Sequence, residues 1–233
     1  MKLNGNKAQN FLLDIFFPIE CLGCGKEDVW LCEQCLATIP LNTSDECPRC
    51  HNFSQGSQTC LKCQRGYYLN GVLTASHYDH PIVRKLVTNL KYNYVKVLVE
   101  PLAQAMVKQL RFRSGFLEEN WLMVPVPLHR KRLLERGFNQ SELLASCLQK
   151  LTGMSWMAAL RRRFWTPPQA ELTGTDRLIN IKGVFEADKK LIKNKKIILI
   201  DDVFTTGGTL NECAFALRQG GAKEVWGLVA ARG

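Results

Sequence analysis

Apolar residues in the second part of the chain alternate between short runs and helical spacings. The short runs predict strands at residues 72–75, 122–126, 196–200 and 225–230. Spacings of three and four predict helices within 81–109 (broken near Tyr92, Asn93 and Tyr94), over 139–151 and over 209–218. The helix at 139–151 should bury Leu143, Leu144, Leu148 and Leu151. Because strands and helices alternate with short connections, we predict an α/β fold with a doubly wound parallel sheet.

The 196–200 run is nearly continuous in β-branched residues, which is typical of a strand buried on both faces of a parallel sheet. Ligands of such sheets bind beyond the carboxyl ends of the strands. The polar residues that follow this run are therefore candidates for a binding site.

An apolar stretch at residues 11–17 resembles a signal sequence at first sight. Asp14 interrupts it and no small-residue cleavage site follows, so we expect a short amphipathic helix that docks on the next segment. No apolar run has the length needed to cross a bilayer, and we expect no membrane span.

Eight of the ten cysteines form four C-x-x-C pairs, a spacing typical of metal ligands. They are Cys21, Cys24, Cys32, Cys35, Cys47, Cys50, Cys60 and Cys63. Two pairs complete a tetrahedral structural zinc site with no open position. Consecutive pairs are expected to share an ion because they close short loops, although interlaced pairing also fits.

A thioredoxin-like dithiol is the alternative interpretation, but no strand-to-helix context surrounds any pair. We predict a cysteine-rich zinc-binding domain over residues 1–66 and an α/β domain over 67–233. Thiolate zinc sites favour a reducing compartment, which predicts a cytoplasmic protein. Cys147 and Cys213 lie on helical apolar patterns and are expected to fill the core.

The excess of positive over negative charge lies wholly in the second domain. Residues 1–66 carry six Lys/Arg and seven Asp/Glu, a net charge of −1. The remaining residues carry 25 Lys/Arg and 14 Asp/Glu, a net charge of +11, so the whole chain has a net charge of +10. Such a surface attracts phosphates of a nucleotide or a nucleic acid. A solvated basic surface without a dedicated partner is the alternative.

Two acids and a glycine turn follow the 196–200 strand. Asp201 and Asp202 come first, and Thr205, Thr206, Gly207, Gly208 and Thr209 open the next helix. Amides at a helix N-terminus next to glycines form an anion site, and carboxylates accept hydrogen bonds from neighbouring hydroxyls. The stretch therefore suits a sugar phosphate. A Walker B strand is disfavoured because no G-x-x-x-x-G-K-[ST] loop occurs.

Residues 198–209 resemble the PRPP (phosphoribosyl pyrophosphate) motif of type I phosphoribosyltransferases. The resemblance implies that Asp201 and Asp202 bind the ribose hydroxyls and that the turn from Thr205 to Thr209 binds the 5′-phosphate. It also implies Mg²⁺ on the pyrophosphate.

A longer resemblance covers nearly the whole chain. The segments Pro125–His129 and Arg136–Gln140, the Asp201–Asp202 turn and the cysteine-rich head are similar to the ComF family (ComFC). This resemblance implies a type I phosphoribosyltransferase-like domain behind a zinc ribbon. It further implies a role in natural competence, with single-stranded DNA and a ComFA-like helicase or other DNA-uptake proteins as partners.

Two basic segments add candidate contacts. His129, Arg130, Lys131 and Arg132 follow a strand where the family's pyrophosphate loop is expected, and their cations would neutralise a diphosphate. Arg161, Arg162 and Arg163 precede two aromatic residues, a pattern that suits single-stranded DNA. Alternatively the first segment is a solvated loop and the second a helix end packed on the core. Residues 166–175 resemble a mobile lid.

The sequence thus predicts a competence accessory protein that binds PRPP, or a related ribose phosphate, and single-stranded DNA. The alternative is an active phosphoribosyltransferase that transfers the sugar to a base-type acceptor and releases pyrophosphate. A third hypothesis makes the zinc domain a docking module for a helicase or membrane partner.

Overall fold

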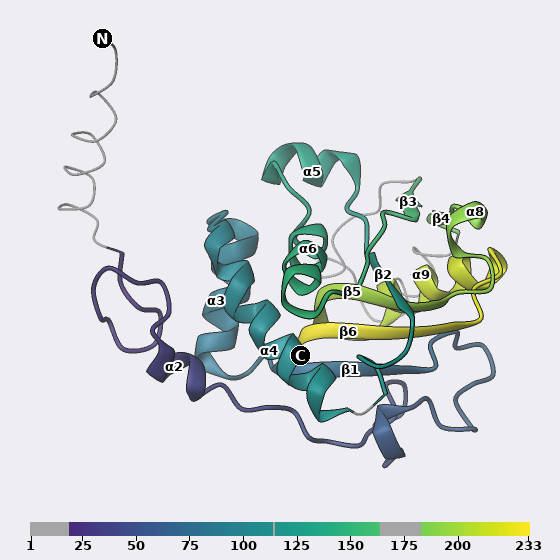
Figure 1. The fold of residues 1–233 in the computed structure, drawn as a ribbon, viewed down its shortest axis with the longest axis horizontal. Helices are drawn as coiled ribbons and strands as arrows, with labels where there is room; N and C mark the ends of the chain where they lie inside the picture. Colours follow the sequence, from purple (N-terminus) through teal and green to yellow (C-terminus); the bar gives the residue numbers. More distant parts are fainter. Residues whose placement is uncertain (1–18, 114, 164–182) are drawn as a thin grey trace, which may run out of the picture.

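Four parallel strands form the central sheet of the computed structural model, which describes residues 19–113, 115–163 and 183–233 (Figure 1). The strand order is β1-β6-β5-β2. The strands are β1 (Gly71–His77), β2 (Trp121–Pro125), β5 (Lys196–Phe204) and β6 (Glu224–Arg232). All four predicted strands and the α/β class are confirmed, and β5 lies between two neighbours.

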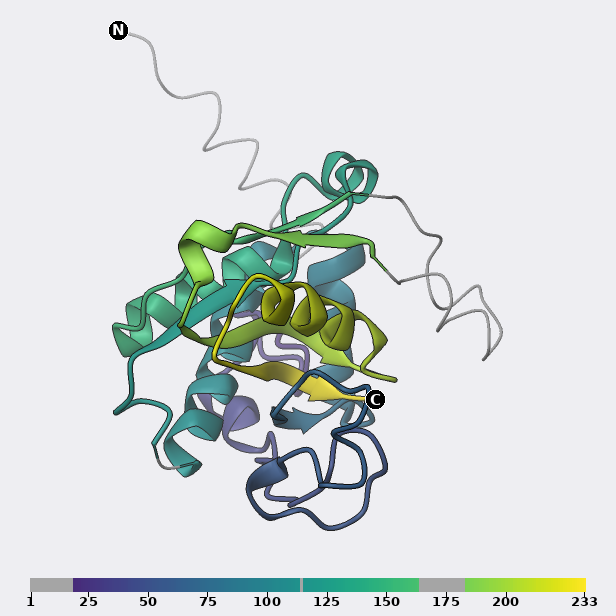
Figure 2. The same cartoon turned by 90° about the vertical axis from the view of Figure 1, so that its right-hand side faces the viewer.

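Helices cover both faces of this sheet (Figures 1 and 2). On one face lie α3 (Pro81–Tyr92), α4 (Val99–Phe112) and α6 (Gln140–Thr152). On the other lies α9 (Gly208–Gln219). The predicted break near Tyr92 is confirmed, because α3 ends there and the short 3₁₀ helix η2 (Lys96–Leu98) leads into α4.

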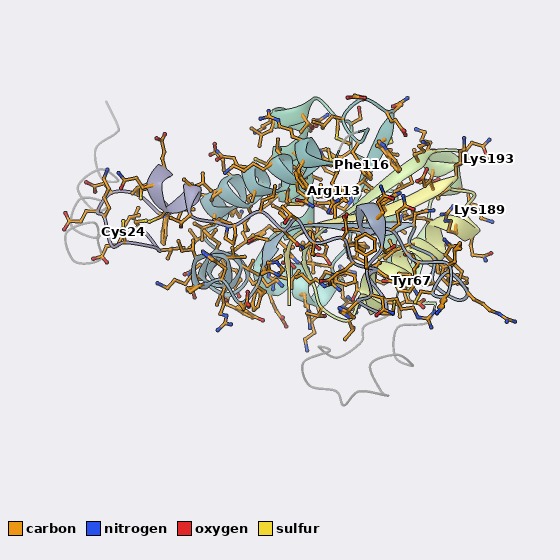
Figure 3. All side chains as sticks on the ribbon, turned by 90° about the horizontal axis from the view of Figure 1, so that it is seen from below. Cys24, Tyr67, Arg113, Phe116, Lys189 and Lys193 are labelled. Atoms are coloured by element: carbon orange, nitrogen blue, oxygen red, sulfur yellow. The ribbon has the colours of Figure 1, made fainter. Side chains whose placement is uncertain are left out.

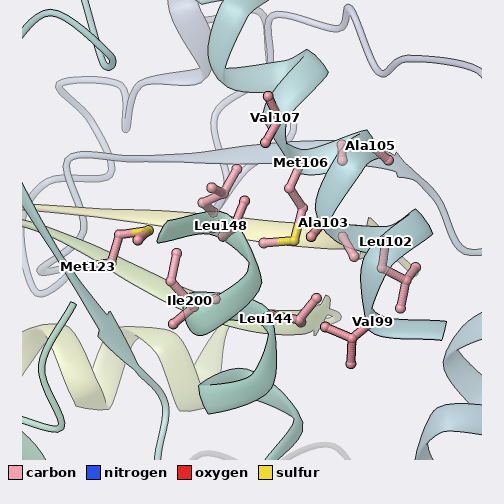
Figure 4. Close-up of a cluster of buried hydrophobic side chains, with 14 of the residues drawn as sticks. Val99, Leu102, Ala103, Ala105, Met106, Val107, Met123, Leu144, Leu148 and Ile200 are labelled. Carbon is pink, nitrogen blue, oxygen red and sulfur yellow. The ribbon is translucent and has the colours of Figure 1, made fainter. Parts of the chain in front are cut away.

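Strand β5 is buried on both faces because its apolar side chains alternate between two cores. Ile198 and Ile200 pack with α4 and α6, where Figure 4 shows Ile200 near Leu144 and Leu148. Ile197 and Leu199 pack on the α9 side. The strand is therefore fixed in register at the centre of the molecule.

The leucine pattern of α6 is confirmed in part. Leu144 and Leu148 are fully buried and Leu143 is half-buried, but Leu151 is 40% exposed. The buried part of the helix ends at Leu148, so the prediction is wrong for Leu151, which lies in the last turn before Gly153. Cys213 is fully buried as expected, whereas Cys147 is only partly buried.

Several short elements were not predicted. They are the helices α5 (Arg130–Arg136) and α8 (Lys189–Ile192) and an antiparallel pair of strands, β3 (Leu160–Arg162) and β4 (Phe185–Ala187). None of the described helices is both long and apolar enough to cross a bilayer. The predicted helix at 11–17 and the lid at 166–175 lie outside the described residues.

The cysteine-rich segment runs along the body (Figure 1). It contains helix α2 (Glu33–Ala37) and the 3₁₀ helix η1 (Gln55–Ser57). The Asn42 backbone amide donates to the Ala75 carbonyl of β1 at 2.9 Å, and Arg113, the C-cap of α4, forms a 2.5 Å ion pair with Asp45. The division at residue 66 remains a prediction, but contacts tie this segment to the sheet and helices at several points.

Candidate functional site

Strand β5 carries Asp201 and Asp202 near its carboxyl end and continues to Phe204. The strand therefore extends four residues beyond the predicted 196–200 run, and both acids lie within it. Asp202 is 3% exposed, and its Oδ1 lies 2.9 Å from Lys91 Nζ at the end of α3. Its Oδ2 is buried and has no hydrogen-bond partner among the described residues.

Asp201 is partly exposed and lies in a different set of contacts. Its Oδ1 accepts hydrogen bonds from Ser141 Oγ at 3.0 Å and from the Asp202 amide at 2.9 Å. Ser141 lies in the first turn of α6, where Asn139 caps the helix by accepting from the Ser141 amide. The α6 N-terminus therefore meets the acids at the sheet edge.

The Asp201 carboxyl titrates differently from that of an isolated aspartate. Burial and the charge of Asp202 raise the pKa of Asp201 to about 7, although Lys91 opposes the shift. Burial lowers the pKa of Lys91, but attraction to Asp202 outweighs burial and raises it. Lys91 thus stays protonated, and the acid edge holds a fixed ion pair beside a carboxyl that changes charge near neutrality. Sequence reasoning missed Lys91 because it is remote from the acids in the chain.

The glycine turn opens helix α9 as predicted. Gly207 is the N-cap with φ +75°, and no side chain of the described residues caps the first turn, so the first amides of α9 are available to an anion. A Cβ at Gly207 would lie 2.7 Å from the Phe204 ring and 2.9 Å from Tyr67 Oη. Thr205 and Thr206 are exposed beside it. Glycine is required at this position for backbone angle and for space.

Tyr67 adds a hydroxyl that the sequence did not reveal. Its Oη is buried beside Gly207 and has no hydrogen-bond partner in the described part of the chain. Burial raises the pKa of Tyr67, so the hydroxyl remains protonated and can donate to a phosphate oxygen. The next residue fixes the segment on α9, since the Tyr68 amide donates to Asn211 Oδ1 at 2.7 Å.

The basic stretch after β2 begins a helix and does not form the expected loop. Arg130, Lys131 and Arg132 form the first turn of α5, and His129 Nδ1 caps it by accepting from the Lys131 amide at 3.2 Å. Because β2 pairs with β5 in parallel, this stretch leaves the sheet at the same edge as the acids. Its role toward pyrophosphate remains a prediction.

The structure brings part of the second basic segment toward this helix. Burial lowers the pKa of His129, and the charges of Arg162, Arg132 and Lys131 lower it further. Arg132 likewise lowers the pKa of Arg162, after burial. Two segments that are 30 residues apart in the chain therefore form one cationic cluster around His129.

Arg161, Arg162 and Arg163 lie in and after β3, not at a helix end. The Arg162 guanidinium stacks 5.6 Å from the centre of the Phe185 ring, and Arg163 Nε forms a 2.9 Å ion pair with Glu186. Arg161 is exposed. The two aromatic residues that follow lie outside the described residues, so the predicted DNA contact is not tested.

The eight predicted cysteine ligands form two clusters. Cys21, Cys24, Cys32 and Cys35 make one, and Cys47, Cys50, Cys60 and Cys63 make the other, with all Sγ atoms of a cluster within 4.8 Å of one another. Consecutive pairing is confirmed, and the interlaced pairing is wrong.

The geometry of both clusters fits zinc. A tetrahedron with Zn–S bonds of about 2.3 Å has S–S edges of about 3.8 Å. The Sγ atoms of Cys24 and Cys32 lie 3.8 Å apart, and those of Cys50 and Cys60 lie 3.7 Å apart. His51, which follows Cys50, belongs to neither cluster, and its Nδ1 lies 2.6 Å from Arg232 Nη2.

Backbone amides prepare one thiolate in each cluster. Burial raises the pKa of Cys21, but the amides of Cys32, Cys24 and Gly23 outweigh it and lower the pKa to about 6. Cys47 follows the same pattern, also with a pKa of about 6. A thiolate that is stable near neutral pH favours metal binding.

Comparisons with known proteins agree with this geometry. Residues 153–231 match the family model described as the phosphoribosyl transferase domain, which includes the acids and the glycine turn. Competence protein F of Haemophilus influenzae is 29% identical over 231 residues, 93% of this chain and 99% of that protein. DNA utilization protein YhgH of Salmonella typhimurium is 30% identical over 203 residues, 84% of this chain and 88% of that protein. Competence protein ComFC of Bacillus subtilis is 25% identical over 202 residues, 84% and 81% of the two chains.

Proposed function

The chain belongs to the ComF family of competence and DNA utilization proteins, and from this premise we propose that it binds PRPP, or a related ribose phosphate, together with single-stranded DNA during DNA uptake. The observation that carries the proposal is the acid pair of β5 followed by the uncapped N-terminus of α9. These residues place hydrogen-bond acceptors and amide donors next to each other at one sheet edge.

Each part of a phosphorylated ribose has a candidate partner at this edge. Asp201, and the Oδ2 atom of Asp202, would accept hydrogen bonds from the ribose hydroxyls. Thr205 to Thr209 would receive the 5′-phosphate, with Tyr67 Oη as a further donor. His129 to Arg132 would face the pyrophosphate from the end of β2.

Mg²⁺ would enter with the ligand. Carboxylate oxygens are the ligands that this ion prefers, and the orphaned Oδ2 of Asp202 fits that preference. When bound, the ion would neutralise pyrophosphate charge. In this chain Asp202 is already balanced by Lys91, so the ion would not have to compensate both acids.

Equilibrium dialysis with radiolabelled PRPP, with and without Mg²⁺, tests the sugar-phosphate part. We expect saturable PRPP binding. Ribose 5-phosphate and pyrophosphate should each displace PRPP, since each occupies one half of the PRPP site. Binding that neither compound reduces would contradict the assignment of the two halves.

An active transferase is the second candidate function, because the matched family model is that of a transferase domain. Release of pyrophosphate from PRPP across a panel of nucleobases distinguishes it from a binding role. Pyrophosphate release with any base would show that the protein is an active transferase. If no base causes release although PRPP still binds, only the binding function remains.

For the protein partners, we propose that the cysteine-rich segment docks a ComFA-like helicase in the cytoplasm. Serine substitutions at exposed surface residues of this segment, such as Lys26 and Glu27, would then weaken partner capture without changing zinc content. Unchanged capture would place the partner surface elsewhere on the chain.

A further inference from the structure

A cavity of about 880 Å³ lies at the opposite end of the sheet from the acids. It opens beside the first residues of β2 and β5, Trp121 and Lys196, and Trp156, Lys195 and Lys223 also line it. Because β2 and β5 are parallel, their first residues lie a full strand length from Asp201 and Asp202. The cavity is therefore separate from the candidate ribose-phosphate site.

Three lysines line this cavity, Lys195, Lys196 and Lys223, and further lysines precede Lys195 in the chain. Lys189, Lys190, Lys193 and Lys195 occur within seven residues, and all four are exposed. Figure 3 shows Lys189 and Lys193 at the end of the molecule opposite Cys24. The Lys223 amide donates to the Lys195 carbonyl at 2.9 Å, which brings a fifth exposed lysine into the same group.

The exposed lysines of this group form no ion pair within the described residues, whereas Lys196 does, and its partner Glu119 also lines the cavity. Lys196 is paired with Glu119 and, at 3.6 Å, with Glu224. Lys193, Lys195 and Lys223 form no ion pair with any residue of 19–113, 115–163 or 183–233. Their charge is thus available to a polyanion, and it would be attractive over about 8–10 Å at physiological ionic strength.

Two tryptophans line the cavity, the half-buried Trp156 and the buried Trp121. Trp156 is half-buried, and its segment is fixed on β2 because the Met157 amide donates to the Met123 carbonyl at 3.0 Å. Behind it, Trp121 is stacked on Phe116 with ring centres 5.2 Å apart, and Lys196 Nζ lies 5.2 Å from the Trp121 ring centre. A partly exposed indole beside unpaired lysines is a combination that binds single-stranded nucleic acid.

We infer that this lysine-rich cavity is the binding site for single-stranded nucleic acid, with a base stacked on Trp156 and phosphates on Lys193, Lys195 and Lys223. The inference rests on the DNA-binding part of the proposed function and relocates it. The Arg161–Arg163 segment is less suited, since Arg163 is paired with Glu186 and Arg162 is stacked on Phe185. The volume of the cavity is within the range of small-ligand sites and accommodates a nucleotide.

Salt-titrated fluorescence anisotropy of the full, zinc-loaded chain with a labelled oligothymidylate tests the inference. Each lost phosphate contact on a single strand reduces the salt slope by about 0.7. Lys193→Gln/Lys195→Gln/Lys223→Gln should therefore lower it by about 2, whereas the matched Arg161→Gln/Arg163→Gln variant should change it little. The opposite ranking would overturn the site, and absence of binding by the wild type would overturn the DNA-binding function as well.

Base stacking on Trp156 can be tested independently of the lysine charges. Trp156→Leu should weaken oligonucleotide binding by about 5- to 150-fold with an unchanged salt slope, and Trp156→Phe should retain most of the affinity. On the unsubstituted protein, photo-crosslinking with an oligonucleotide that carries 5-iododeoxyuridine should label the peptide containing Trp156. Labels confined to other peptides would contradict the site, whatever the folding of the variants.

Discussion

The ion pair between Asp202 and Lys91 sets the charge of the acid edge. The two side chains are 4% and 22% exposed, so water screens them little. Lys91 holds Oδ1 at 2.9 Å and leaves Oδ2 without a partner among the described residues. Asp202 Oδ1 therefore stabilises the fold, and Oδ2 is available to a ligand.

Removing one partner of this pair should cost more than removing both. Asp202→Ala leaves the Lys91 ammonium uncompensated, and we expect the free energy of unfolding to fall by about 3–5 kcal/mol. Asp202→Ala/Lys91→Met should recover most of that loss. Urea unfolding of zinc-loaded proteins measures both variants, and a double variant no more stable than Asp202→Ala would show that the pair is not coupled.

Asp201 should make stability depend on pH. Its folded pKa of about 7 lies above the ordinary value of 3.8, so between these values the folded state binds more protons than the unfolded state. The contribution of this group to stability is therefore full below about pH 4 and declines as pH rises toward 7. Asp201→Asn should remove the decline.

Urea midpoints of the wild type and Asp201→Asn, measured between pH 5 and 8, check this prediction. Both proteins retain the zinc ligands. Taking the difference between their urea midpoints at each pH therefore removes the effect of zinc-ligand titration. We expect the variant to gain stability relative to the wild type as pH rises. A difference that is constant over this range would contradict the assigned pKa.

At the scale of elements, the turn between β5 and α9 combines a backbone angle and a tight space. Gly153, at the end of α6, has nearly the same φ of +77°, but no atom of the described residues lies within 4 Å of its added Cβ. Comparing substitutions at Gly153 and Gly207 therefore separates the energetic cost of the left-handed backbone angle from the cost of steric crowding at Gly207.

Gly153→Ala should cost about 1 kcal/mol of stability, the penalty of a left-handed angle alone. Gly207→Ala should cost clearly more, because its Cβ would meet the Phe204 ring at 2.7 Å. It should also weaken PRPP binding, since the displaced turn carries the phosphate amides. Equal costs in thermal unfolding would show that the turn can relax around the methyl group.

The sequence predicted the long apolar elements and the site residues that lie within them. The strand at 196–200 and the helix at 209–218 were recognisable because burial on β5 and α9 repeats along the chain. Short elements such as α5 and β3 carry little apolar periodicity and were missed. Lys91 and Tyr67 were missed because only the tertiary fold brings them to residues 201–209.

Across the whole molecule, the cysteine-rich segment supports two different regions. The first cluster packs against Ile82 of α3, and Lys85 Nζ donates to the Leu22 carbonyl at 2.8 Å. The second cluster approaches the phosphate turn through Arg49, which donates to the Cys63 carbonyl at 3.0 Å and lies 6.0 Å from the Tyr67 ring centre. Tyr67 in turn reaches Gly207.

Loss of the second cluster should therefore weaken PRPP binding more than loss of the first. Cys47→Ser/Cys50→Ser and Cys21→Ser/Cys24→Ser should each bind one zinc ion fewer per chain by elemental analysis. Only the former should approach the effect of Tyr67→Phe, a loss of about 0.5–1.5 kcal/mol in PRPP binding. Equal binding by the two cysteine variants would separate the second cluster from the phosphate turn.

The two proposed sites lie at opposite ends of one sheet, with sugar phosphate at the carboxyl end of β5 and nucleic acid at its beginning. Calorimetric titration of PRPP and Mg²⁺ into the wild type and Asp201→Asn/Asp202→Asn tests the central claim, with Glu186→Gln as an exposed acidic control. We predict that the wild type and the control bind alike and that the double variant loses at least about 1.5–3 kcal/mol, the value of hydrogen bonds to charged acceptors. Equal affinity of the double variant, with its zinc content intact, would contradict the claim that these acids hold a phosphorylated ribose.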